Sequence, residues 1–163
     1  MKNLILIRHA KSCWNVPQKD IDRPISKRGS KDAHLIASMI HEILPSTYVV
    51  WSSVSKRTKE TAYIFSGYLQ IPFETIHFSK DLYTFDLNEL EEVIKKCENS
   101  FHNLILFGHN EAITKFVNKF GDRNIDNVPT SGVVAMQFNI KHWKHLSKGK
   151  TLTTLFPSQF KNE

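Results

Sequence analysis

Arginine and histidine side chains follow directly on apolar stretches of this sequence. Arg8 and His9 come after the run "LILI", and His109 comes after "LILFG". Arg57 lies shortly after the segment "VVWSS". A guanidinium group holds phosphate oxygens through its planar fork, and a neutral imidazole has a nucleophilic lone pair near physiological pH. Gathered in one place, these side chains would suit the binding and transfer of a phosphoryl group.

The elements that must carry these side chains alternate between strands and helices. Continuous apolar runs predict buried strands at residues 4–7, in "TYVVWSS" and in "NLILFGHN". Apolar residues at three-to-four spacing predict helices over residues 27–44, 55–66, 87–97 and 111–120, the third capped by Asp86 or Asn88. A weaker strand is predicted at 73–78, and antiparallel edge strands at 133–140 and 151–156. This order indicates an α/β domain with a largely parallel sheet.

The predicted strand ends explain how distant residues can meet. Ligands of open α/β sheets bind beyond the carboxyl ends of the strands, where the sequence places Arg8-His9, Ser52-Ser53 and Gly108-His109-Asn110. Arg57 falls near the first turn of the following helix, from which its side chain can bend back over the same crevice. Helix N-termini also favour anions. We therefore expect one cationic, phosphate-binding site at this edge.

Several segments resemble the histidine phosphatase superfamily. "RHAKSCWN", "SSVSKRTKETA" and "GHNEAITKF" are similar to its three signature segments, with Ala10 where many members have glycine. "DIDRPISKRG" and "VPTSGVV" resemble the short SixA-type phosphohistidine phosphatases, so the likeness runs from Leu4 to about Val134. The resemblance implies a phosphoglycerate mutase-like three-layer α/β sandwich, with a mostly parallel central sheet and helices on both faces. It also implies a single domain over residues 1–163 without a separate cap domain.

The resemblance also assigns roles to individual residues. His9 would be the nucleophile that becomes phosphorylated, and Arg8, Arg57 and His109 would hold the phosphoryl oxygens. The residues expected to assist substrate binding are Asn15, Ser12 and Asn110. The second ring nitrogen of His9 needs a hydrogen-bond acceptor, which we expect to be a backbone carbonyl that the sequence does not identify. We expect no cofactor and no metal, and Asp20 and Asp22 are interpreted as an exposed loop pair.

The proton donor for an alcohol leaving group is not evident. Some branches of the superfamily have a carboxyl group directly after the second histidine, where this sequence has Asn110. Glu111 is the candidate general acid, although its place at a helix start is also explained by the helix dipole; Asp81 and Glu89 are weaker candidates. Without an acid, phosphohistidine becomes an attractive substrate because imidazole, whose conjugate acid has a pKa of about 6.5, is a good leaving group.

Three functions fit these residues. The first is removal of a phosphoryl group from phosphohistidine in a protein domain, and the second is hydrolysis of a small phosphate ester of a metabolite. The third is a non-catalytic phosphoprotein-binding domain, which would have no need of a nucleophile at a strand end. In each case we expect phosphate or sulfate to occupy the site.

Composition excludes other classes. The chain has 163 residues, 40% hydrophobic and 23% charged, which is typical of one soluble domain. Its longest apolar run is too short for a membrane helix or signal peptide, and the two cysteines form no CxxC pair, so we expect a cytoplasmic protein and no membrane partner. The net charge of +6 favours anionic partners. Nucleic acid is not expected because no basic stripe interleaved with aromatic residues occurs.

Overall fold

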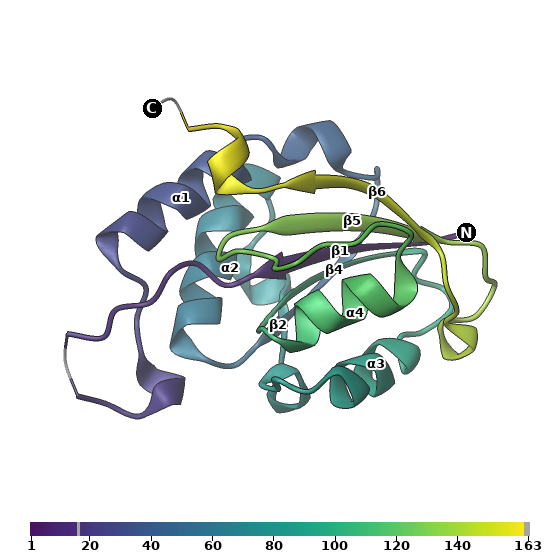
Figure 1. Cartoon of the computed structure of the whole chain (residues 1–163), viewed down its shortest axis with the longest axis horizontal. Coiled ribbons are helices and arrows are strands. Elements are labelled where there is room, and N and C mark those ends of the chain that lie inside the picture. Colours follow the sequence, from purple (N-terminus) through teal and green to yellow (C-terminus); the bar gives the residue numbers. More distant parts are fainter. Residues whose placement is uncertain (16, 162–163) are drawn as a thin grey trace.

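A six-stranded sheet forms the centre of the molecule, with strand order β3-β2-β4-β1-β5-β6 (Figure 1). This computed structural model describes residues 1–15 and 17–161. Strands β1 to β4 are parallel, whereas β5 is antiparallel to both β1 and β6. The bounds are β1 Lys2–Arg8, β2 Val49–Ser53, β3 His77–Ser79, β4 Asn103–Gly108, β5 Val133–Phe138 and β6 Lys150–Leu155. The predicted parallel sheet with an antiparallel edge is confirmed.

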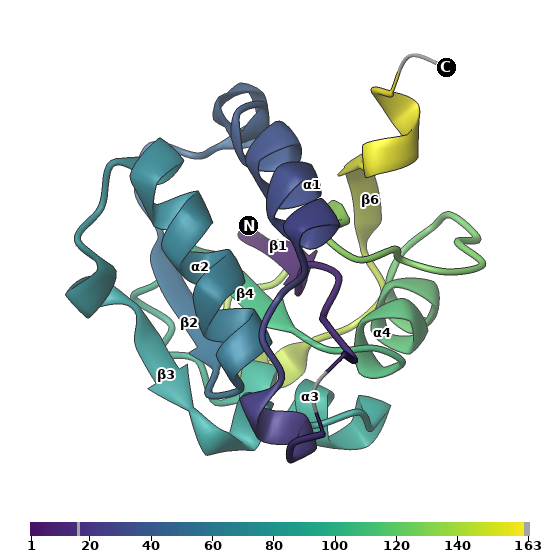
Figure 2. The same cartoon turned by 90° about the vertical axis from the view of Figure 1, so that its left-hand side faces the viewer.

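Helices cover both faces of this sheet. They are α1 Lys27–Ala37, α2 Lys56–Leu69, α3 Leu87–Lys95 and α4 Ala112–Phe120. Ile5 and Ile7 of β1 belong to the core under α1 and α2, and Leu4 and Leu6 belong to the core under α3 and α4. Figure 2 shows the two pairs on opposite sides of the sheet. Because successive strand residues point to opposite faces, covering both faces requires the continuous apolar run seen in the sequence.

Within the described residues, no helix has the length and apolar character needed to cross a membrane.

Side-chain caps fix the starts of the first three helices. Ser26, Ser55 and Asp86 each accept a hydrogen bond from a backbone N–H in the first turn, which satisfies a donor that the helix itself leaves free. Asp86 is one of the two caps expected for α3. Ser55 matters most for the site, because it sets where α2 begins and so where Arg57 lies.

Two predicted elements are wrong in extent. The helix expected over residues 27–44 ends at Ala37, and a separate 3-10 turn follows at Ile40–Ile43. The N–H of Met39 bonds to the Ile36 carbonyl, so the chain tightens to three-residue spacing while Ile40 stays buried in the same core. The strand expected over 73–78 is also shorter, because residues Phe73–Thr75 form a 3-10 turn after Pro72 and pairing with β2 begins at His77.

The carboxyl ends of β1, β2 and β4 lie side by side at the left-hand end of the sheet in Figure 1. The register places Arg8 opposite Gly108 and Ser52 opposite Phe107. The three polar groups that follow these strands therefore meet at one edge, as the sequence predicts.

Candidate active site

His9 is held by the backbone on either side of it. Its N–H donates to the Gly108 carbonyl at 3.1 Å, and its ring Nδ1 lies 2.7 Å from the Ala10 carbonyl oxygen. A carbonyl oxygen can only accept, so Nδ1 carries the ring proton. The lone pair is then on Nε2, which faces Nε of Arg57 at 3.4 Å. The carbonyl that the sequence left unidentified is that of Ala10.

The environment of His9 favours its neutral form. Burial is the main cause of a pKa lowered to about 3, and the positive charges of Arg57 and Arg8 add to it. The hydrogen bond to Ala10 acts in the opposite direction but is outweighed. A second proton, on Nε2, would place a positive charge in a buried, cationic setting. His9 is therefore neutral at physiological pH, and the lone pair of its Nε2 carries no proton.

Arg57 reaches the site from the first turn of α2. The N–H of Ala10 donates to Oγ1 of Thr61 at 2.8 Å, and that hydroxyl donates to the Arg57 carbonyl at 2.7 Å. These bonds tie the start of α2 to the chain directly after His9. The Arg57 side chain is almost fully buried, so its orientation is fixed by its partners rather than by solvent.

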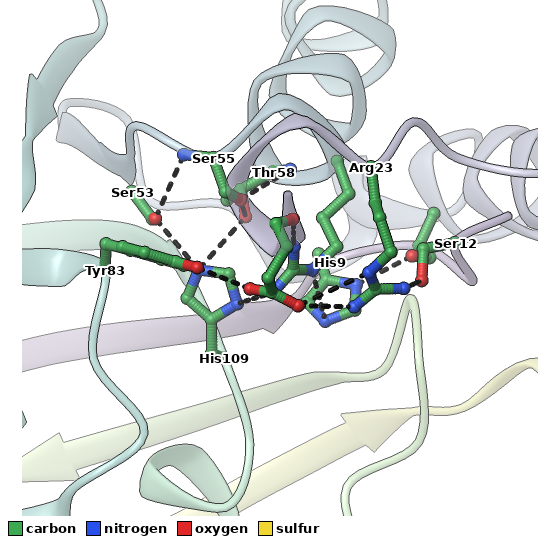
Figure 3. Close-up of polar contacts among 11 residues, drawn as sticks. His9, Ser12, Arg23, Ser53, Ser55, Thr58, Tyr83 and His109 are labelled. Carbon is green, nitrogen blue, oxygen red and sulfur yellow. Dashed lines mark hydrogen bonds and ion pairs between the residues drawn. The ribbon is translucent and has the colours of Figure 1, made fainter. Parts of the chain in front are cut away.

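His109 lies beside His9, with ring centroids 5.3 Å apart. Its Nδ1 is 3.4 Å from Nη2 of Arg57, and its Nε2 is 2.8 Å from Oγ of Ser53. A guanidinium can only donate, so Nδ1 accepts and Nε2 donates to Ser53. Figure 3 shows Ser53 and His9 on different sides of the ring. Burial lowers the pKa of His109, and repulsion from a protonated His9 and from Arg57 adds to this effect, so this ring is also neutral.

Arg8 is anchored to the loop before β5. Its Nη1 donates to the Val128 carbonyl at 3.0 Å, and the N–H of Ser131 bonds to the carbonyls of Arg8 and His9. Burial, with a smaller effect of the Arg57 charge, lowers the Arg8 pKa. Its buried Nε has no hydrogen-bond partner among the described residues. A buried donor left free in a cationic cluster is suited to an oxyanion ligand.

Asp20 is exposed, as expected of a loop residue, but it also belongs to this cluster, which the sequence did not predict. Its Oδ2 lies 3.0 Å from Nη2 of Arg57, its Oδ1 lies 3.0 Å from Nη2 of Arg23, and its backbone oxygen accepts from Nη1 of Arg57 at 2.7 Å. The Tyr83 hydroxyl donates to Oδ2. Burial acts to raise the Asp20 pKa, but the bonds from Tyr83, Arg23 and Arg57 hold it well below its usual range. Asp22 is exposed as well.

The expected substrate-binding helpers are not grouped with the histidines. Ser12 is buried and accepts a hydrogen bond from Arg23. Asn15 is exposed in the loop after β1. The Asn110 amide donates to the side chain of Asn127 and to the Val128 carbonyl, while its oxygen accepts from the N–H of Thr114. Ser12 therefore contacts Arg23, and Asn110 holds the start of α4 against the loop that anchors Arg8.

The candidate general acids also lie outside the cluster. The Glu111 side chain is 75% exposed and lies 3.7 Å from Lys115, one turn along α4. Asp81 is exposed, and Glu89 accepts a hydrogen bond from Thr84 at the start of α3. Among the described residues, Asp20 is the carboxylate that touches the cluster. Its lowered pKa keeps it ionised, so it accepts hydrogen bonds and does not supply protons at neutral pH.

Exposed and half-buried aromatic side chains pack against Arg23 and His109, a feature that the sequence patterns did not reveal. Trp14 is 74% exposed and stacks on Arg23, with the guanidinium carbon 3.6 Å from the ring centroid. Phe85 is 49% exposed, and its ring centroid lies 5.2 Å from that of His109. Tyr83 packs against both Phe85 and His109. We call Trp14, Tyr83 and Phe85 the aromatic rim.

The donors of the cluster suit an oxyanion rather than a cation. Arg8, Arg57 and Arg23 supply fixed positive charge, and the buried imidazole of His9 presents its lone pair beside them. In the part of the chain that the structure describes, no group of three or more His, Cys, Asp or Glu side chains is arranged to hold a metal ion. Together with Nε of Arg8, which has no hydrogen-bond partner among the described residues, these charges favour an oxyanion ligand beside His9.

Two curated proteins are similar to parts of the chain. An uncharacterized chloroplastic protein of Arabidopsis thaliana is 29% identical over 120 residues, which cover 68% of this chain and 55% of that protein. A 2,3-bisphosphoglycerate-dependent phosphoglycerate mutase of Gloeothece citriformis is 40% identical over 67 residues, 39% of this chain and 29% of that enzyme. The chain thus matches about half of the first relative's length and less than a third of the second's.

A solved structure and a family model also match the chain. The protein histidine phosphatase SixA, complexed with tungstate, superposes with a TM-score of 0.81 over 98% of this chain and 99% of that one, at 15% identity. This likeness confirms the expected phosphoglycerate mutase-like fold. The model of the histidine phosphatase superfamily (branch 1) matches residues 4–103, which include most of β1, all of β2 and α2, and the residues His9 and Arg57. The chain belongs to the histidine phosphatase superfamily.

Proposed function

We propose that this protein is a phosphatase that transfers a phosphoryl group to Nε2 of His9 and then to water. The observation that carries the proposal is the fixed tautomer of His9: Nδ1 is bound to the Ala10 carbonyl at 2.7 Å, and the unprotonated Nε2 faces Arg57. A nucleophile with a preset lone pair, beside fixed positive charge, is what in-line attack on a phosphoryl group requires.

The reaction proceeds in two displacements. The lone pair of Nε2 forms a bond to phosphorus while the bond to the leaving group breaks and its electron pair departs with that group. A water molecule then attacks the phosphohistidine, which releases inorganic phosphate and returns the lone pair to Nε2. In both steps negative charge grows on the equatorial oxygens, where Arg8 and Arg57 stabilise it most strongly because they are already in place.

His109 contributes through its position between these groups. Its neutral ring is held by Ser53 on one side and lies against Arg57 and His9 on the other. When a phosphoryl dianion binds, its charge favours a proton on Nδ1, which then donates to a phosphoryl oxygen. We propose this as the role of His109, with Ser53 fixing the ring.

The substrate that fits best is phosphohistidine in a protein domain. Asp20, the carboxylate in contact with the cluster, is ionised and is no proton donor. A phosphohistidine whose second ring nitrogen is protonated releases neutral imidazole, so no acid is needed. The exposed aromatic rim supports a substrate presented on a protein surface. We propose that residues 1–163 act as one domain without a separate cap.

A metabolite phosphatase is the second candidate. The phosphoglycerate mutase of Gloeothece citriformis is named for its action on a phosphorylated metabolite, and its matching segment is 40% identical. Such a substrate has an alcohol leaving group, which leaves with difficulty unless an acid protonates it. A non-catalytic phosphoprotein-binding domain is the third candidate, and it would not require the lone pair on His9.

One experiment separates these candidates. A protein domain labelled with radioactive phosphate on histidine is incubated with the wild-type protein, and rapid acid-free quenching followed by peptide mapping locates the label. We expect loss of label from the domain, transient label on His9, and turnover at least about a thousandfold slower in His9→Ala. His41→Ala, which alters an exposed histidine, should behave as wild type. Faster hydrolysis of 3-phosphoglycerate than of the domain would favour the metabolite candidate, and binding without turnover would favour the third.

A further inference from the structure

The carboxylate of Asp20 is bound to the guanidinium of Arg57, the group that must also bind the phosphoryl group of the proposed substrate. Oδ2 of Asp20 lies 3.0 Å from Nη2 of Arg57, and the Tyr83 hydroxyl donates to the same oxygen. Asp20 takes no part in either displacement of the proposed reaction. An ionised carboxylate beside the nucleophile also repels a phosphoryl dianion, so its presence there requires an explanation.

The donors of Arg57 are already distributed among partners. Its Nε points to Nε2 of His9, its Nη1 donates to the Asp20 backbone oxygen, and its Nη2 lies between Oδ2 of Asp20 and Nδ1 of His109. Because Nε2 of His9 faces Nε of Arg57, a phosphoryl group that approaches Nε2 comes next to the edge formed by Nε and Nη2. The carboxylate of Asp20 and a phosphoryl oxygen therefore compete for Nη2.

We propose that Asp20 is a displaceable plug, a carboxylate that fills part of the oxyanion site when it is empty and yields to an arriving phosphoryl group. This inference rests on the proposed phosphatase function. After hydrolysis the same carboxylate returns to Arg57 and competes with inorganic phosphate, which promotes release of the product. Asp20 would thus set how tightly the site holds a free oxyanion without taking part in bond formation.

The local structure allows this displacement without movement of the chain. Asp20 begins the 3-10 turn Asp20–Asp22, and its side chain is 44% exposed. Its other oxygen, Oδ1, is bound by Nη2 and Nε of Arg23 at 3.0 and 3.3 Å. When Oδ2 leaves Arg57, the carboxylate keeps the Arg23 ion pair. The bond from Nη1 of Arg57 to the Asp20 backbone oxygen also remains, so Arg57 stays in position.

The test measures binding of inorganic phosphate by titration calorimetry. Asp20→Asn keeps the shape and one neutral hydrogen-bond acceptor but removes the competing charge, so we expect its Kd for phosphate to fall about tenfold, the size of one charge-assisted hydrogen bond. Asp22→Asn removes the same charge from an exposed neighbour in the same turn. Its Kd should stay within about twofold of wild type. Phosphate should also inhibit turnover more strongly in Asp20→Asn.

Other outcomes would overturn the proposal in distinguishable ways. Weaker phosphate binding in Asp20→Asn would show that the carboxylate orients Arg57 for the ligand. An unchanged Kd with a large fall in kcat would show a role in activating water. An equal fall in the Kd of Asp22→Asn would show that the effect comes from the net charge of the protein and not from the position of Asp20. If wild type and both variants turn over phosphohistidine but none binds phosphate, the proposal for Asp20 is wrong and the phosphatase proposal stands. If none of them binds phosphate or turns over phosphohistidine, both proposals are wrong.

Discussion

The Arg57 guanidinium joins the groups that the strand ends bring together. It lies within 3.4 Å of His9 and His109 and within 3.0 Å of Asp20. Burial leaves it no solvent partner, so each of its contacts depends on the others. A change at any one of these residues should therefore alter the rest, and effects of double substitutions should not be additive.

At the scale of residues, the proximity of four side chains could be predicted from their places at strand ends and at a helix start. Arg8, His9 and His109 follow buried strands, and Arg57 follows a capped helix start, so rules of chain geometry place them near one another. Asp20 and Tyr83 reach the site from the connections after β1 and β3, whose path is set by tertiary packing. Their contacts depend on which loop folds over which strand, and no periodicity in the sequence encodes that choice.

The buried histidines should make stability depend on pH. The pKa of His9 falls from the ordinary 6.5 to about 3 on folding, so the unfolded chain takes up a proton before the folded protein does. Stability is then lost as the pH falls from about 6.5 towards 3. Between pH 7 and pH 5, His9 alone should account for a loss of about 2 kcal/mol in the free energy of unfolding.

Urea unfolding at pH 7 and pH 5 tests this prediction. His9→Asn removes the titrating group, so its stability should decline by about 2 kcal/mol less than that of wild type over this range. His109, whose pKa is also lowered by burial, should still titrate in this variant, and part of the dependence should remain. The same decline in both proteins would contradict a buried, neutral His9.

At the scale of elements, α1 determines the path of the chain that follows His9. The N–H and hydroxyl of Ser26 both donate to the Lys11 carbonyl, and Gly29 in the first turn packs against the same peptide. A Cβ added at Gly29 would lie 2.1 Å from the Lys11 oxygen. The glycine of "SKRG" is therefore needed for close approach of helix and loop, although its helical backbone would accept other residues.

Gly29→Ala should destabilise the protein by about 1–3 kcal/mol, because backbone atoms of residue 11 must move to accept the methyl group. The displaced loop also carries Ala10, the hydrogen-bond acceptor of His9, so phosphatase activity should fall as well. Gly67→Ala is the matched control, since that exposed position in α2 has no atom within 4 Å of an added Cβ. It should stabilise the protein by about 0.5–1 kcal/mol. Equal effects in urea unfolding would refute the close-approach argument.

Element types were more predictable than element ends. Both faces of β1 are buried, so its apolar run identified it as a strand. The extent of α1 could not be obtained in this way, because Ile40 and Ile43 keep the apolar spacing after the chain has tightened into a 3-10 turn. The spacing of apolar residues indicates which side chains face the core, but an α-helical turn and a 3-10 turn can both produce this spacing.

At the scale of the whole molecule, charge and shape bear on how a substrate arrives. The chain carries a net charge of +6, and the arginines of the site lie at one end of the sheet, behind the aromatic rim. A cationic protein attracts an acidic partner over distances set by the ionic strength. A small phosphoryl donor interacts mainly with the site itself.

Salt should therefore separate these two kinds of substrate. From about 10 to about 150 mM ionic strength the Debye length shortens from about 30 to about 8 Å, so kcat/KM for an acidic phosphohistidine domain should fall about tenfold. For phosphoramidate, a small phosphoryl donor, the fall should stay below about threefold, because its charge is felt mainly inside the site, where screening is weak. For a basic phosphohistidine domain, kcat/KM should rise with added salt, because salt screens its repulsion from this cationic protein. Equal salt dependence for all three substrates would show that the surface charge of this protein plays no part in selecting its partner.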